Sequence, residues 1–183
     1  MLPEESQQLC RLFAEVLDYP GASLAESANE CLRQLDACLP DIADQMRSFV
    51  TFVESQGRGA LEELYTATFD MAPALTQYIG YHLFGETPKR SAFLVRLEEA
   101  YQSHGFDSGT ELADHLCVLL RFFSVAQDVE FVMPLLEECI LPVLDKMAGD
   151  LRKSKNSYAP AVTSLRLFLQ QLSRRLAKVG GLA

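Results

Sequence analysis

Apolar residues recur at intervals of three and four along nearly the whole chain, and this spacing restricts the fold more than any other feature. Three sets near the N-terminus show it: Leu9, Leu12, Phe13, Val16 and Leu17; Leu24, Ala28, Cys31, Leu32 and Leu35; Ile42, Met46, Phe49, Val50 and Val53. Residues three and four apart share one face of an α-helix, so each set predicts an amphipathic helix. No segment alternates apolar and polar residues between hairpin turns, so we expect no sheet. The predicted fold class is all-α.

Proline and glycine divide the pattern into about eight or nine helices in a single-domain bundle over residues 1–183. Later helices are expected at about 60–69, 75–83, 88–104, from 108 onward, after residue 128, and at 157–179. Ser108-Gly-Thr-Glu111 has the spacing of a capping box, which predicts a helix start there with Leu112 facing inward. Pro142 should kink or divide the helix after residue 128. The polar segment 149–157 is expected to be a mobile linker, and Gly180-Gly181 to end the last helix.

Composition narrows the class of protein. Apolar residues make up 49% and charged residues 22%, which is typical of a globular chain. No run approaches the roughly 18–20 apolar residues that span a bilayer, so no integral membrane segment is expected. The first residues are acidic and lack the apolar stretch of a secretory signal. We therefore expect a cytoplasmic protein.

The five cysteines favour no metal site. They are odd in number and dispersed, and no CxxC or Cys–His spacing joins them. Zinc sites require such spacing, so buried, reduced thiols are the better interpretation, and neither a metal nor another cofactor is predicted.

Charge is divided unevenly along the chain. Residues 1–150 carry a net charge of −16 and residues 151–183 a net charge of +7. Nucleic acid needs a basic surface, so an acidic body argues against that partner and favours one with a basic segment. The basic helix at 157–179 could contact phosphate or an anionic membrane, although such runs are more often a solvated helix face.

Residues able to do chemistry gather between positions 61 and 124. Glu111 and His115 are four apart with Asp114 between them, and two interpretations remain. They are either capping and first-turn residues of a helix, or a carboxylate and an imidazole presented to a ligand. A di-metal bundle needs Glu-x-x-His on two helices, which is missing, and the chain has no GxSxG or phosphate-loop pattern. A small metal-binding or hydrolytic helical protein using Asp114, His115 and His82 remains an alternative. A helical repressor is disfavoured because the first 60 residues are acidic.

Four elements of this region resemble those of a known family, in order and in spacing. They are Tyr65-x-x-x-Phe69-Asp70, Gly85-Glu86-Thr-Pro-Lys89-Arg90, Leu97-x-x-x-Tyr101-x-x-x-Gly105, and Glu111-Leu-x-Asp114-His115-Leu116. Together they resemble the redox-enzyme maturation chaperones of the TorD, DmsD and NarJ types, and most closely the NarJ-type nitrate reductase delta subunit. Ala113 and Arg121 depart from the NarJ pattern.

The resemblance implies an all-helical chaperone that performs no catalysis and holds no cofactor. Such a protein binds the immature catalytic subunit of a molybdopterin-dependent oxidoreductase, often through its N-terminal segment, and assists molybdenum cofactor insertion and complex assembly. A homodimer is a further expectation.

A chaperone of this kind needs a groove with apolar walls and a few polar anchors. The candidate client-binding residues are Tyr65, Phe69, Asp70, His82, Glu86, Arg90, Glu111, Asp114 and His115. Further candidates for the apolar walls are Tyr78, Tyr81, Phe84, Phe122 and Phe123, although large aromatic side chains are more often core residues. The acidic anchors would suit a segment that carries arginine or lysine.

Overall fold

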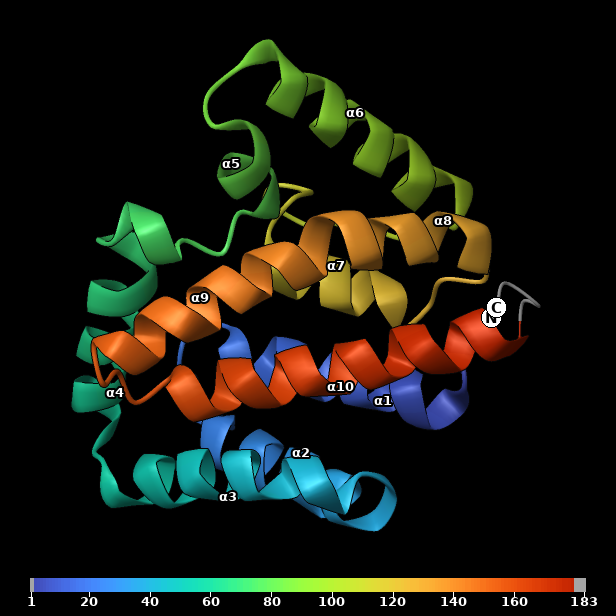
Figure 1. Ribbon diagram of the computed structural model, residues 1–183. Helices are drawn as coiled ribbons and strands as arrows, with labels where there is room; N and C mark the ends of the chain where they lie inside the picture. Colours follow the sequence, from blue (N-terminus) through green and yellow to red (C-terminus); the bar gives the residue numbers. More distant parts are fainter. Residues whose placement is uncertain (1, 180–183) are drawn as a thin grey trace.

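The computed structural model describes residues 2–179 as helices joined by turns (Figure 1). The α-helices are α1 (Glu4–Leu17), α2 (Leu24–Cys38), α3 (Pro40–Ser55), α4 (Arg58–Tyr65), α5 (Ile79–Phe84), α6 (Pro88–Ser103), α7 (Leu116–Phe123), α8 (Val129–Pro134), α9 (Leu141–Lys153) and α10 (Ala159–Val179). Over these residues the only β pairing is an isolated antiparallel bridge between Tyr78 and His115. The all-α prediction is confirmed.

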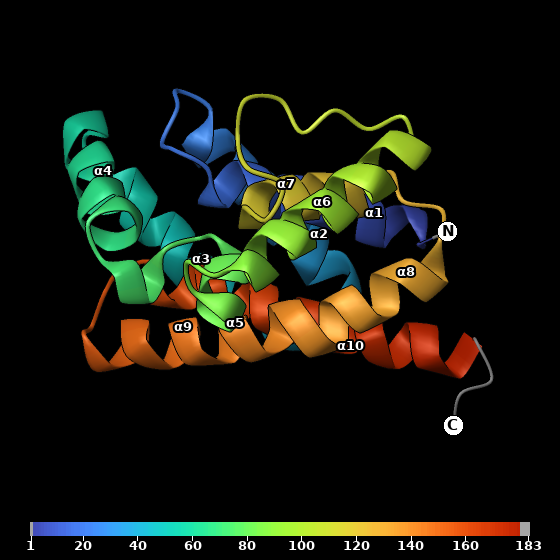
Figure 2. The same cartoon turned by 90° about the horizontal axis from the view of Figure 1, so that it is seen from above.

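Helices α1, α7 and α10 form the centre of the bundle. Helix α1 packs against α2, α7 and α10, while α2 and α3 form an antiparallel pair that covers one side (Figures 1 and 2). Phe13 of α1 stacks on Phe168 of α10, with ring centroids 5.6 Å apart. Every residue of α7 except Arg121 is buried. The apolar stripes predicted for the first three helices face this core, since Leu9, Phe13, Leu35, Met46 and Phe49 are almost fully buried.

Two stretches of the chain adopt π-helical geometry where α-helix was predicted. Residues Thr66–Asp70 continue α4 as a π-helical turn, and Leu135–Ile140 join α8 to α9 in the same way. Pro142 is the second residue of α9 and follows the π-helical stretch directly, so the α-helix after residue 128 is divided there, as predicted. If α8, the π-helical stretch and α9 are counted as one helix, residues 2–179 contain nine helices, which agrees with the predicted eight or nine.

Three local expectations are wrong. Residues 149–153 belong to α9, so the predicted linker shrinks to the short turn that precedes α10. The Ser108 to Glu111 segment caps no helix: α7 begins only at Leu116, and Leu112 is 46% exposed. Residues 76–78 are also not helical. The expected stop at Gly180-Gly181 lies outside the described residues.

Among residues 2–179, each helix is either too short or too polar to span a lipid bilayer. The cysteine prediction agrees with the structure, because all five thiols are free and Cys10, Cys31 and Cys117 are buried.

Candidate binding cavity

Two extended segments far apart in sequence pair with each other and shape one wall of a cavity. The Ile79 amide donates to the Asp114 carbonyl at 2.9 Å, and the Leu116 amide donates to the Gln77 carbonyl at 2.8 Å. Consecutive side chains of an extended segment point to opposite sides. The Asp114 carboxylate therefore points toward α5 and α6, whereas the His115 ring points into the cavity.

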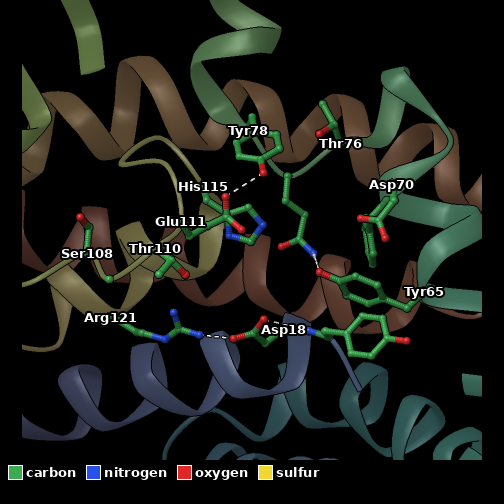
Figure 3. A pocket seen from close by; sticks show the side chains of 14 residues that line it. Asp18, Tyr65, Asp70, Thr76, Tyr78, Ser108, Thr110, Glu111, His115 and Arg121 are labelled. Atoms are coloured by element: carbon green, nitrogen blue, oxygen red, sulfur yellow. Dashed lines mark hydrogen bonds and ion pairs between the residues drawn. The ribbon is translucent and has the colours of Figure 1, made fainter. Parts of the chain in front are cut away.

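The cavity has a volume of about 490 Å³ and lies between the end of α1, the π-helical turn after α4, the two extended segments and α7 (Figure 3). Its lining residues are Asp18, Tyr19, Tyr65, Phe69, Asp70, Thr76, Gln77, Tyr78, Ser108, Gly109, Thr110, Glu111, His115 and Arg121.

Each carboxylate of the cavity is followed in the chain by an exposed large apolar residue. Asp18 precedes Tyr19, Asp70 precedes Met71, and Glu111 precedes Leu112. These three apolar residues are 52%, 75% and 46% exposed, respectively. The described residues contain only two other exposed large apolar side chains, so three of the five follow directly in sequence after a carboxylate that lines the cavity. Such an arrangement of acidic and apolar groups suits a segment with both basic and apolar side chains.

Glu111 is held in its charged form by a hydrogen-bonded contact across the cavity. The Tyr78 hydroxyl donates to Glu111 Oε1 at 2.8 Å, and the Leu112 amide donates to the same oxygen at 3.0 Å. Burial acts to raise the pKa of Glu111, but these hydrogen bonds outweigh it and lower the pKa. Burial and the bond to Glu111 raise the pKa of Tyr78 to about 12. The second carboxylate oxygen has no partner among these contacts and is available to a ligand.

His115 contributes a neutral imidazole. Its Nδ1 accepts a hydrogen bond from the Cys117 amide at 3.3 Å, which makes His115 the N-cap of α7. Burial lowers the pKa of the ring, although the nearby Glu111 charge opposes that shift. A neutral His115 leaves the negative charge of the carboxylates uncancelled.

Aromatic rings form the opposite wall. Tyr65 packs edge-on against Phe69, with ring centroids 5.1 Å apart, and both rings contact Tyr158 from α10. The Gln77 amide Nε2 donates to Tyr65 Oη at 3.1 Å and to the Leu17 carbonyl at 2.8 Å. These two bonds fix the aromatic wall relative to the end of α1.

Behind the cavity wall, Arg90 and Asp114 form a buried ion pair. Arg90 Nε and Nη2 donate to the two oxygens of Asp114 at 2.8 and 3.2 Å, and the Asp114 side chain is fully buried. The guanidinium also lies over the rings of Tyr78 and Tyr81, at 5.4 and 5.9 Å from their centroids. Because Tyr78 touches both Arg90 and Glu111, this pair supports the cavity without entering it.

The structure brings together five of the nine candidate residues. Tyr65, Phe69, Asp70, Glu111 and His115 line the cavity. Arg90 and Asp114 lie behind its wall, and His82 Nε2 bonds to the Thr76 carbonyl at 2.7 Å. Glu86 is exposed and lines a separate hollow at the start of α6.

The interpretation of Asp114 and His115 as first-turn residues of a helix that starts near Ser108 is wrong, because they precede α7 and are buried. Phe122 and Phe123 are core residues and form no groove wall. The cavity also contains four residues that no sequence pattern identified, because their contacts join distant parts of the chain: Asp18, Tyr19, Gln77 and Arg121.

The arrangement does not favour the metal-binding or hydrolytic alternative. Asp114 and His115 face opposite sides of an extended segment, and Asp114 is already paired with Arg90. Within residues 2–179, no three His, Cys, Asp or Glu side chains come close enough together to hold a metal ion.

The fold is that of a redox enzyme maturation protein. It matches the crystal structure of a candidate redox enzyme maturation protein from Archaeoglobus fulgidus with a TM-score of 0.60 over 90% of this chain and 93% of that one, at 20% identity. The model of the family described as nitrate reductase delta subunit matches residues 22–173, and the chain belongs to that family.

Two curated relatives have the same name, nitrate reductase molybdenum cofactor assembly chaperone NarJ, and come from Escherichia coli strains K12 and O157:H7. Each is 26% identical to this chain over 152 residues. That stretch covers 81% of this chain and 64% of each relative.

Proposed function

We propose that this protein is a chaperone that binds the immature catalytic subunit of a molybdopterin-dependent oxidoreductase of the nitrate reductase type. It assists molybdenum cofactor insertion and assembly of the complex, and it catalyses no reaction itself. Membership of the nitrate reductase delta subunit family and the chaperone name of its two relatives support this role. Because such a client is loaded before it is exported or docked at a membrane, we place the chaperone in the cytoplasm. We also propose that residues 1–183 form one domain.

The observation that carries the proposal is the cavity itself. Its walls combine the aromatic side chains of Tyr19, Tyr65 and Phe69 with carboxylates, and Asp70 makes no ion pair within the described part of the chain. The N-terminal segment of the client enters this cavity, with apolar side chains against Tyr65 and Phe69 and a basic side chain at Asp70 and Glu111. The proposed client site is therefore Tyr65, Phe69, Asp70, Glu111 and His115, with Arg90 and Asp114 positioning its wall.

Coproduction with a client tests this role. The chain is produced together with the catalytic subunit of a nitrate-reductase-type enzyme, in one host that makes the molybdenum cofactor and in one that cannot. The chaperone should copurify with the apo subunit and not with the loaded enzyme. Equal recovery of both forms, or recovery of neither, would overturn the proposal.

Pairing of two copies of the chain remains a prediction, which size-exclusion chromatography with light scattering tests.

A further inference from the structure

Arg121 is the one cation of Lys or Arg type among the residues that line the cavity. It is also the only charged residue of α7, whose other side chains are apolar and buried. Its guanidinium pairs with the carboxylate of Asp18, which follows the last residue of α1 (Figure 3). The two residues are 103 positions apart in sequence, so the fold places this cation in an otherwise acidic cavity.

The pair contributes little to the stability of the fold. The side chains of Arg121 and Asp18 are 39% and 43% exposed, and solvent-exposed ion pairs contribute on the order of 0–1 kcal/mol. Its larger effect is on the charge that a ligand meets. Asp18 is paired with a cation, whereas neither Asp70 nor Glu111 forms an ion pair among the described residues.

The charge of Arg121 also acts on other residues that line the cavity. Burial is the main cause of the lowered pKa of His115, and the Arg121 charge adds to it while Asp18 opposes it. The Arg121 charge also acts to lower the pKa of Glu111, so it is felt at a second group that lines the cavity.

We propose that Arg121 is a specificity-determining residue, which occupies Asp18 and restricts the cavity to client segments whose basic side chain binds at Asp70 and Glu111. This inference rests on the proposed function. One basic side chain binds at Asp70 and Glu111, which have no ion-pair partner among the described residues, whereas a second basic side chain that approaches Asp18 meets the Arg121 guanidinium and is repelled. Removing the Arg121 charge would turn Asp18 into a second anchor.

The test uses three synthetic peptides of equal length and equal apolar content, which carry no arginine, one arginine or two. Each is titrated calorimetrically into the full chain and into Arg121→Gln. The wild type should prefer the peptide with one arginine to the peptide with none. Arg121→Gln should bind the peptide with two arginines about threefold to fivefold more tightly than the wild type does, which is the scale of one exposed ion pair.

Two further variants separate specificity from structure and from net charge. Arg96→Gln, on the exposed surface of α6, changes the net charge by the same amount away from the cavity and should leave all three affinities unchanged. Asp18→Asn breaks the same ion pair but leaves Arg121 unneutralised, so it should weaken binding of both arginine peptides. A merely structural ion pair would make Arg121→Gln and Asp18→Asn change affinity in the same direction.

Opposite changes in the two variants support the inference. Changes of the same sign, or a gain in Arg121→Gln no larger than in Arg96→Gln, overturn it while leaving the chaperone role standing. If the wild type binds none of the peptides, but does bind an apo catalytic subunit, the cavity does not select by charge and the inference fails alone. If it binds neither, the proposed function fails as well.

Discussion

Asp114 is fully buried and accepts two hydrogen bonds from Arg90, at 2.8 and 3.2 Å. The pair joins the first turn of α6 to the segment that precedes α7. On the same segment, the Asp114 carbonyl accepts a hydrogen bond from the Ile79 amide, and the Tyr101 hydroxyl donates one to the Ala113 carbonyl at 2.7 Å. The conformation of the cavity wall therefore depends on an interaction that lies outside the cavity.

Asp114→Asn should destabilise the protein by about 3 kcal/mol, because it leaves the Arg90 guanidinium, only 17% exposed, without its charged partner. Urea unfolding followed by circular dichroism measures this loss. Asp44→Asn provides the control: Asp44 pairs with Arg47 on the exposed surface of α3, and its loss should cost less than about 1 kcal/mol. Equal losses in the two variants would show that burial of the Asp114 pair does not matter.

Gly80→Ala should destabilise the protein by about 1–3 kcal/mol, although alanine favours helices. A Cβ at position 80 would lie 2.6 Å from Asp114 Oδ2 and 3.0 Å from Phe93 Cδ1, so the buried ion pair would have to move. Gly149→Ala is the matched control, since nothing lies within 4 Å of a Cβ there and α9 continues through it. That variant should gain up to about 1 kcal/mol. Thermal unfolding of the two variants and the wild type measures these changes in stability. Stabilisation by Gly80→Ala would contradict the close packing at position 80.

Local spacing predicted the helices around these two sites, but not the long-range contacts that form them. The periodic apolar residues predicted α1 to α3, α6 and α10, because a helix is determined by neighbours three and four positions away. The extended pairing of residues 76–79 with 114–116 was not predictable in this way, because each segment finds its partners more than 30 residues distant. Ser108 and Glu111 have the residue types of a capping box, but the Glu111 side chain instead accepts a hydrogen bond from the Tyr78 hydroxyl.

The candidate site was predicted in part for the same reason. Tyr65, Asp70, Glu111 and His115 belong to elements that resemble a family, so their residue types and spacing identified them. Asp18 follows an ordinary amphipathic helix and Arg121 belongs to an apolar one, and only the packing of α1 against α7 brings the two residues together.

Stability should decrease as pH falls below about 6.5, the ordinary pKa of histidine. Burial lowers the pKa of His115 and of His82 in the folded protein, so the unfolded chain takes up protons first and is favoured. Glu111, whose pKa is lowered from 4.5, acts only at more acidic pH, where its stabilising charge is lost.

Unfolding free energies measured from pH 7 to pH 5 test this dependence. His115→Gln and His82→Gln should each flatten the pH profile, by up to about 1.4 kcal/mol per pH unit. A profile as steep in both variants as in the wild type would show that these rings do not carry the effect.

Client binding should weaken as salt is added. The carboxylates at the mouth of the cavity attract a basic segment, and surface attraction is screened over about 8 Å at physiological ionic strength. Calorimetric titrations of a client N-terminal peptide at several salt concentrations give the slope. Asp70→Asn should reduce that slope, whereas Asp41→Asn on the first turn of α3 should not. If the affinity for the peptide does not change with salt concentration, binding depends on the apolar walls alone.

Binding of an apo catalytic subunit by a cavity variant tests the central claim most directly. Asp70→Asn combined with Glu111→Gln removes both free carboxylates, and Glu5→Gln combined with Asp41→Asn removes the same charge from the first turns of α1 and α3. Once circular dichroism has shown that both variants are folded, surface plasmon resonance measures Kd for the apo subunit. The cavity variant should bind about tenfold more weakly than the wild type, with the control variant unchanged. Equal affinity of all three proteins would contradict the assignment of the cavity as the client site.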